Sequence, residues 1–257
     1  MRRRFFGALL ILCINSSILA APRARSRYLM GTLLEVTAED GADAVFAETA
    51  RLDALLSTFK PDSEVSRLNR AAGSGPIAVS SDLWNVLQAS SEVWSASGGA
   101  FDPSYASSPR ARGFGRVALD AARHTAALPP GARLDFGGIG KGYALDAAAA
   151  VLRARGQRRA LLNFGGQLLA LGAWDVRAGS ETVHLQDESV SGSGESERPG
   201  HIVDPATGRP VRGRASVFVI LPSATLADAW STALYVRGPG ALPDRFAGRV
   251  VYAAPGE

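Results

Sequence analysis

The position of the only cysteine limits how this chain can be held together. The chain has 257 residues, and Cys13 lies within residues 1–21, a segment laid out like a secretory signal. Three arginines at 2–4 precede an apolar run at 5–14, and small residues at 20–21 suit a cleavage position. Once this segment is removed, no cysteine remains for a disulfide, a thiolate metal site or a cysteine nucleophile. The remaining chain must therefore be stabilised by a packed core.

The apolar run at 5–14 is short for a bilayer-spanning helix, although an uncleaved anchor is an alternative. We expect a signal peptide at 1–21 and one domain at 22–257. The expected location is exported and periplasmic, with attachment to the inner membrane left open, as is the export route.

The composition indicates an ordinary globular domain. The chain is 46% hydrophobic and 20% charged, which argues against both disorder and a polytopic membrane protein. Three of the 28 basic residues lie in the signal segment, so the remainder nearly balances the 24 acidic residues. A nucleic-acid-binding face would need a clustered basic excess, and we expect no such partner. Only Lys60 and Lys141 are lysines, and a lysine suits a phosphate as a compact point charge.

Hydrophobic periodicity predicts helices and strands that do not alternate strictly. Helices are expected at 42–59, 81–97, 141–155 and 224–236, and strands at 28–38, 76–80, 133–136, 215–221 and 250–253. The segment 159–171 is expected to be a strand pair or a strand kinked around Gly165 and Gly166. This order favours an α+β fold with mixed or antiparallel sheets over a doubly wound parallel sheet.

A glycine-rich turn at 134–146, LDFGGIGKGYALD, leads from an expected strand into a helix opened by Lys141. Backbone N–H groups at such a helix start favour an anion, and the lysine adds positive charge, which suits a pyrophosphate. The turn is not a Walker A loop, because Gly142 follows the lysine. A structural turn with an exposed lysine is the alternative.

Asp228 and Thr232 are four residues apart in the expected helix LADAWSTALYVRG, so they lie on one helical face. A carboxylate and a hydroxyl form a hard-oxygen pair of the kind that magnesium accepts beside substrate phosphates. An aspartate favoured by the helix dipole, with an incidental threonine, is the alternative.

Three further segments could carry chemistry. His201 begins HIVDPATGRPV and could accept a proton near neutral pH, or could be a structural histidine. Asp102 in GGAFDPS could bind a polar ligand edge or simply start a turn. In SVSGSGESER, residues 189–198, the glycines permit close approach to a ligand, whereas the alternative is a flexible surface loop.

These motifs occur in an order that resembles the motif order of one protein family. The series comprises MGT, STFKPDSEVSRLN, GGAFDPS, LDFGGIGKGYALD, LLNFGGQLLALG, SGSGESER, HIVDPATGRPV and ADAWSTAL, between Met30 and Gly238. It resembles the ApbE family, the FAD:protein FMN transferases, and the resemblance implies an α+β fold related to the T-fold. It also implies an exported, Mg²⁺-dependent enzyme that transfers the FMN half of FAD to a threonine hydroxyl of a partner flavoprotein and releases AMP. Association with the membrane would come through that acceptor.

The resemblance also implies the roles of individual residues. Asp228, Thr232 and the backbone carbonyl of Gly140 would bind magnesium. His201 would act as the base, and Asp228 and Lys141 would be the other catalytic residues. The residues expected to contact FAD are Met30, Phe59, Asp102, Lys141, Gly166, Ser193 and Arg198.

Three positions depart from the family pattern. Phe59 stands where tyrosine is frequent, Gln167 where an acidic residue is frequent, and Gly192 where threonine is common. They keep open the alternative of a non-catalytic FAD-binding protein. A further alternative is a magnesium-dependent FAD pyrophosphatase that releases FMN and AMP, because water could replace the acceptor hydroxyl at the same site.

Overall fold

A computed structural model describes residues 23–195 and 200–253 of the chain. The expected signal peptide at 1–21 and the FAD-contact candidate Arg198 lie outside the described residues. Within them, no helix is both long and apolar enough to cross a membrane.

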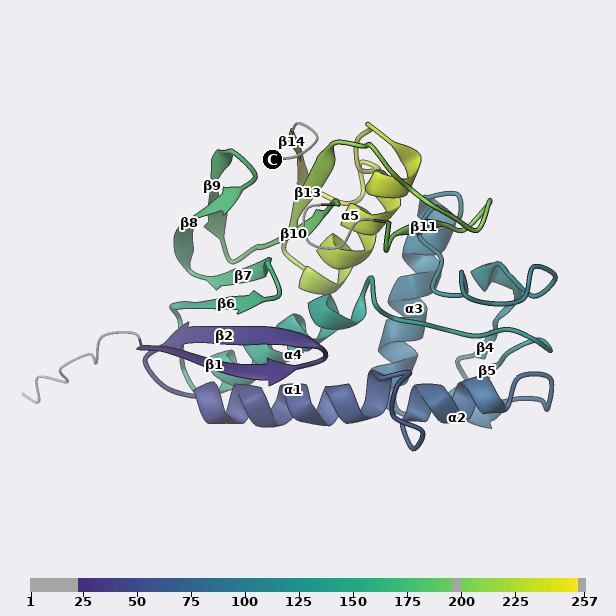
Figure 1. Cartoon of the computed structure of the whole chain (residues 1–257). Helices are drawn as coiled ribbons and strands as arrows, with labels where there is room; N and C mark the ends of the chain where they lie inside the picture. Colours follow the sequence, from purple (N-terminus) through teal and green to yellow (C-terminus); the bar gives the residue numbers. More distant parts are fainter. Residues whose placement is uncertain (1–22, 196–199, 254–257) are drawn as a thin grey trace, which may run out of the picture.

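One antiparallel sheet of seven strands organises the fold (Figure 1). Its spatial order is β1-β2-β6-β7-β10-β13-β14, and every neighbouring pair is antiparallel. The strands span Arg23–Leu29 (β1), Thr32–Ala38 (β2), Ala160–Phe164 (β6), Gln167–Leu171 (β7), Ser189–Ser193 (β10), Ser216–Leu221 (β13) and Arg249–Ala253 (β14). With the helices described below, this confirms the expected α+β class.

The first strand expected from the sequence, 28–38, is wrong, because a hairpin turn divides this part of the chain. Met30 and Gly31 have φ values of 46° and 79° and form a two-residue turn between β1 and β2. Gly165 and Gly166, with φ values of 56° and 83°, make the equivalent turn between β6 and β7. Two successive left-handed residues are typical of the turns that match the twist of antiparallel strands.

Five α-helices cover the sheet and extend beyond it: α1 (Ala42–Leu56), α2 (Glu64–Arg70), α3 (Ser81–Ala96), α4 (Gly140–Ala154) and α5 (Ala224–Arg237). Serines cap three of their N-termini, because Ser63, Ser80 and Ser223 each accept a hydrogen bond from a backbone N–H in the first turn. At the other end of α5, Arg214 donates to the carbonyl oxygens of Tyr235 and Val236. These bonds satisfy carbonyl groups that the helix itself leaves unpaired.

Short strands form three smaller sheets: β3-β5-β4 (Ile77–Ala78, Thr125–Ala127, Ala118–Asp120), β8-β9 (Ala173–Ala178, Glu181–Gln186) and β11-β12 (Val203–Asp204, Arg209–Pro210). A 3-10 turn, η1, spans Phe114–Arg116. The strand expected at 133–136 is wrong. The backbone N–H and carbonyl of Leu134 there bond to the side chain of Asn69, and the N–H of Asp135 donates to the carbonyl of Pro103. These partners are not strands.

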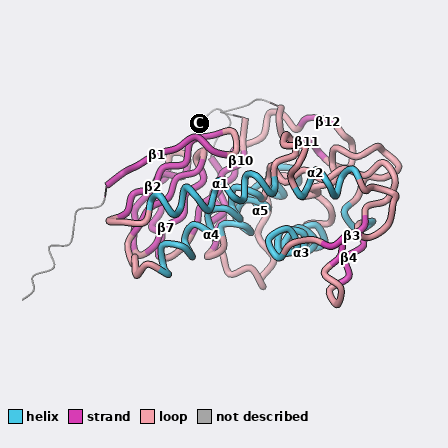
Figure 2. Tube along the Cα trace, turned by 90° about the horizontal axis from the view of Figure 1, so that it is seen from below, coloured by secondary structure: helices cyan, strands magenta, loops and turns pink. Residues whose placement is uncertain are grey.

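Two large hydrophobic clusters lie side by side. One joins α1 and α4 to the half of the sheet formed by β2, β6 and β7, and the other surrounds α3 and α5. Figure 2 shows the sheet toward one end of the molecule, α2, α3 and the small β3–β4 sheet toward the other, and α4 and α5 between them. The start of α4 and the middle of α5 therefore meet in the interior, where both clusters end.

Candidate active site at the junction of α4 and α5

The glycine-rich turn begins α4 through backbone hydrogen bonds. The N–H groups of Ile139 and Gly140 both donate to the carbonyl of Phe136, at 3.1 and 2.7 Å. The Asp135 carboxylate accepts from the N–H of Gly137, and Lys141 Nζ lies 3.4 Å from the Gly137 carbonyl. Lys141 is therefore the first charged side chain of α4, as the sequence predicts.

Gly142 allows α4 and α5 to approach closely. A Cβ at this position would overlap the carbonyl oxygen of Ala224 and would lie 2.9 Å from Cβ of Asp228. Its N–H donates to Asp228 Oδ2 at 3.0 Å, and Lys141 Nζ lies 3.7 Å from the same oxygen. The first turn of α4 thus supplies a backbone donor and a positive charge to one oxygen of a carboxylate that is only 5% exposed.

Asp146 fixes the same junction from the next turn of α4. Its two carboxylate oxygens accept hydrogen bonds from the hydroxyl of Ser223, the N–H of Ala224, and both the N–H and the hydroxyl of Thr225. A side chain of one helix therefore caps the N-terminus of the other. The sequence analysis assigned Asp146 no role, because no local pattern in α4 shows which helix start lies beside it.

Thr232 lies one turn after Asp228 on α5, as the spacing predicts. Its hydroxyl lies 3.4 Å from the Asp228 carbonyl, and a Cβ on Gly138 would lie 3.0 Å from the same hydroxyl oxygen. The glycine turn therefore approaches Thr232 as well as Asp228. We call residues 137–142 together with Asp228, Ser231 and Thr232 the junction.

Ser193 joins the junction from the sheet. Its hydroxyl lies 2.9 Å from that of Ser231, and the hydroxyl of Ser191 lies 3.3 Å from Ser231 and 3.5 Å from Asp228 Oδ1. Residues 189–193 form the largely buried strand β10, so the interpretation of this stretch as a flexible surface loop is wrong. A Cβ at Gly192 would lie 2.8 Å from the Phe218 ring, which explains glycine at that position.

The donors of the junction fit a hard divalent cation. Asp228 Oδ2 accepts a hydrogen bond from the Gly142 N–H, whereas Oδ1 accepts from the Ser191 hydroxyl at the long distance of 3.5 Å. A buried carboxylate with spare acceptor capacity, beside the Thr232 hydroxyl, suits magnesium if substrate phosphates and water supply further ligands. Among the described residues no group of three or more His, Cys, Asp or Glu could hold a metal by itself.

Asp102 is buried at the start of the loop that leads to η1. One of its oxygens accepts from both the N–H and the hydroxyl of Ser104, and the Ser104 hydroxyl accepts in turn from the N–H of Gly113. Burial raises the pKa of Asp102 above its ordinary value, although the bonds from Ser104 and Phe114 and the charge of Arg112 act in the opposite direction. Asp102 thus organises its own loop.

His201 is exposed and directly precedes the β11–β12 hairpin. In the hairpin turn, Asp204 accepts from the N–H of Ala206 and from the hydroxyl of Thr207, a pattern typical of Asp-Pro turns. Arg112 donates to the carbonyl of Pro205 at 3.2 Å. The loop that contains Asp102 therefore also holds the hairpin that follows His201.

The other FAD-contact candidates lie on separate elements. Met30 is half-buried in the β1–β2 turn, Gly166 is exposed in the β6–β7 turn, and Phe59 is 93% exposed after α1. Phe59 borders an open cavity of about 530 Å³ that Asn69, Arg70 and Arg133 also line. Phe59 reaches solvent fully and Met30 in part, whereas the side chains of Asp228, Ser231 and Thr232 make hydrogen bonds within the junction or to β10.

Gln167, one of the departures from the family pattern, lies next to the junction. Its side-chain amide donates to the carbonyl of Ala224 at 2.9 Å, and its Oε1 is buried without a hydrogen-bond partner among the described residues. A carboxylate at this position could not donate to that carbonyl unless it were protonated. The glutamine therefore supplies the donor that the Ala224 carbonyl needs.

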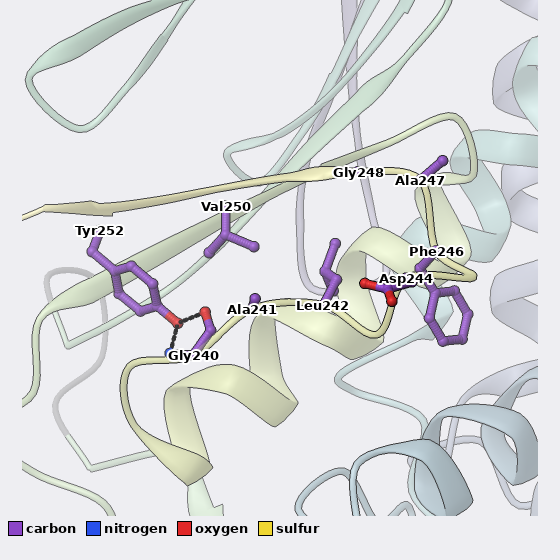
Figure 3. A pocket seen from close by; sticks show the side chains of 9 residues that line it. All are labelled: Gly240, Ala241, Leu242, Asp244, Phe246, Ala247, Gly248, Val250 and Tyr252. Atoms are coloured by element: carbon purple, nitrogen blue, oxygen red, sulfur yellow. Dashed lines mark hydrogen bonds between the residues drawn. The ribbon is translucent and has the colours of Figure 1, made fainter.

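A second cavity of about 460 Å³ lies apart from these residues, between the segment after α5 and β14 (Figure 3). The Tyr252 hydroxyl closes one side by bonding both the N–H and the carbonyl of Gly240. No candidate residue lines this cavity.

Comparison with known proteins gives a consistent result. A family model described as ApbE family matches residues 30–249. Two proteins of Klebsiella pneumoniae named FAD:protein FMN transferase are 29% and 31% identical to this chain, covering 93% and 83% of it and 87% and 82% of their own lengths. A Treponema pallidum protein of the same name is 30% identical, over 84% of this chain and 78% of its own.

Solved structures share the fold. The flavin transferase ApbE from Vibrio cholerae superposes with a TM-score of 0.80 at 22% identity, covering 91% of this chain and 93% of that one. The apo form of the Pseudomonas stutzeri flavinyl transferase ApbE gives 0.79 at 25% identity, covering 91% and 96%.

Proposed function

Because this chain belongs to the ApbE family, we propose that it is an FAD:protein FMN transferase. The proposed reaction moves the FMN half of FAD to a threonine hydroxyl of an acceptor flavoprotein and requires magnesium. The observation that carries the proposal is the position of Asp228. This buried residue lies on α5, and its carboxylate accepts a hydrogen bond from the Gly142 N–H in the first turn of α4.

The proposed step exchanges one P–O bond for another. The acceptor threonine oxygen attacks the phosphorus of the FMN half, the bond from that phosphorus to the bridging oxygen breaks, and AMP leaves with that oxygen. The threonine loses its proton, and the AMP phosphate carries the negative charge. Such a transfer needs positioning and charge stabilisation more than it needs a protein nucleophile.

The residues of the junction would divide this work. Asp228, Thr232 and the carbonyl of Gly140 would hold magnesium, which when bound would neutralise phosphate charge. Lys141 adds a positive charge on the same side, 3.7 Å from Asp228. Lys141 lies in the first turn of α4, and the dipole of a helix N-terminus favours anions. This arrangement would orient the diphosphate of FAD.

His201 is the proposed proton acceptor for the threonine hydroxyl. It is exposed, so an acceptor protein can reach it, and a neutral imidazole nitrogen can accept a proton. The loop containing Asp102 and Arg112 would place His201 through the β11–β12 hairpin. Met30, Phe59, Gly166, Ser193 and Arg198 complete the proposed FAD contacts.

We further propose that the protein is exported to the periplasm, on the strength of the signal-like segment 1–21. The acceptor would then be an exported or membrane flavoprotein, and association with the inner membrane would follow from that partner.

The test is incubation of the purified protein with FAD and Mg²⁺, with and without an acceptor domain carrying a threonine site, followed by mass spectrometry. A gain of one FMN on the acceptor, abolished by EDTA, is the expected result. Free FMN and AMP without acceptor modification would instead establish a pyrophosphatase, and intact FAD after hours would indicate a binding protein.

A further inference from the structure

Three buried serine hydroxyls form a chain that starts at Asp228. Ser191 and Ser193 alternate along β10 and so face the same side of the sheet, toward Ser231 on α5. Ser231 and Ser191 are 0% and 1% exposed. Ser193 is 9% exposed and is the last residue of β10, directly before residues 194–195. The chain thus runs from the carboxylate to one of the proposed FAD contacts.

Ser231 is the central member of this series of hydroxyl groups, because it contacts all the others. Its hydroxyl lies 2.9 Å from the Asp228 carbonyl, 2.9 Å from Ser193 Oγ and 3.3 Å from Ser191 Oγ. A hydroxyl has one proton to donate and two lone pairs to accept with, so these three partners saturate it. If Ser231 donates to the carbonyl, both neighbouring serines must donate to Ser231.

This proton accounting links the two ends of the chain. While Ser191 donates to Asp228 Oδ1, it can only accept from Ser231, so Ser193 must donate to Ser231 and can only accept from a ligand. If Ser191 instead donates to Ser231, Ser231 can turn its proton toward Ser193, which then becomes free to donate to a ligand. The donor state of Ser193 therefore depends on whether the Asp228 carboxylate needs the Ser191 proton.

We propose that Ser231 is a positioning residue that couples cation binding at Asp228 to FAD binding at Ser193. This inference rests on the proposed function. A cation on Asp228 Oδ1 would displace the Ser191 proton toward Ser231, so that Ser231 donates to Ser193 and Ser193 donates to FAD. Cation and FAD would then each raise the affinity for the other, because coupling between two sites is reciprocal.

A buried serine on a helix does not by itself imply such a chain. Ser90 on α3 is also 0% exposed, and its hydroxyl has no hydrogen-bond partner among the described residues. Ser90→Ala is therefore a matched control, because it removes a buried helical hydroxyl without breaking a bond.

The test measures the dissociation constant of Mn²⁺ by electron paramagnetic resonance with and without FAD, and that of FAD by flavin fluorescence with and without Mg²⁺. The ratio of the values with and without the other ligand is the coupling factor. Ser231→Ala should lower this factor about tenfold, within the usual range for coupled sites, and Ser90→Ala should leave it unchanged. Ser191→Ala, which cuts the chain at Asp228 but leaves the pair of Ser231 and Ser193, should lower it as well.

Ser193→Ala provides the second arm. It should weaken FAD binding about fivefold in the wild-type protein, the value of one hydrogen bond, and less than twofold in Ser231→Ala. Additive effects of the two substitutions, or an unchanged coupling factor with only a lower melting temperature, would overturn the inference. A wild-type protein that binds Mn²⁺ but no FAD would overturn the proposed function as well, so the two failures are distinguishable.

Discussion

The junction and the exposed candidates differ in what holds their side chains. At the junction, Asp228 is 5% exposed and is bonded by backbone and side-chain groups of other elements. Phe59, by contrast, is 93% exposed. The difference indicates that the chain itself preforms the phosphate and cation end of the proposed site. At Phe59, the ligand would cover a side chain that the protein leaves in solvent. Substitutions in the two regions should therefore have different effects.

The largest effect is expected at Asp228. Asp228→Asn keeps an oxygen that can accept from Gly142 N–H but removes the charge, so the fold should remain while transfer falls roughly a thousandfold, as expected if several kcal/mol of charge stabilisation are lost. Acceptor modification by mass spectrometry and Mn²⁺ binding measure the two consequences. Transfer within tenfold of wild type would remove Asp228 from the cation site.

Gly142 tests whether the junction is preformed by close packing. Gly142→Ala would place a Cβ against the Ala224 carbonyl, and backbone cannot yield as a side chain can, so we expect a loss of about 3 kcal/mol in the free energy of unfolding. Urea unfolding measures it.

Gly140→Ala is the matched control for Gly142→Ala, because its Cβ would meet only Phe136 Cβ at the ordinary distance of 3.8 Å. It should be neutral or slightly stabilising. Equal destabilisation by both substitutions would contradict the account of helix packing.

Phe59 tests the exposed region. Phe59→Ala should change the free energy of unfolding by less than about 0.5 kcal/mol, because the side chain packs on almost nothing. The KM for FAD should rise about tenfold, the value of a lost aromatic stacking contact. Phe59→Tyr, which keeps the ring, should retain wild-type KM. A strongly destabilised Phe59→Ala would show that this region is also held internally.

The smallest effect concerns the pH dependence of stability at Asp102. Burial raises the native pKa of its carboxyl above the unfolded value, so the native state binds the proton more tightly. Ionised Asp102 therefore subtracts from stability at neutral pH, and this deficit disappears as the pH falls through the native pKa. Relative to Asp102→Asn, the wild-type protein should gain stability between pH 7 and pH 4 in urea unfolding.

Asp120 gives the opposite sign as a control, because its hydrogen bond from the Arg123 side chain lowers its pKa. Relative to Asp120→Asn, the wild-type protein should lose stability as the pH falls through the native pKa of Asp120. If both comparisons showed stability changing in the same direction as the pH falls, the raised native pKa of Asp102 would be contradicted.

The sequence by itself determined the local features of this protein. The spacing of Asp228 and Thr232 placed both on one helical turn, the glycine-rich turn led into a helix opened by Lys141, and the order of eight motifs pointed to the ApbE family. Such features depend on neighbours within a few residues, which the sequence displays directly.

Tertiary structure alone decided which distant groups share a partner. It placed Asp146 at the start of α5, Gln167 beside Ala224, and Ser231 between β10 and Asp228. It also bonded Leu134 to Asn69 where a strand was expected. These contacts join residues far apart in the chain, and their energies arise only when packing removes water from both partners, so no local pattern encodes them.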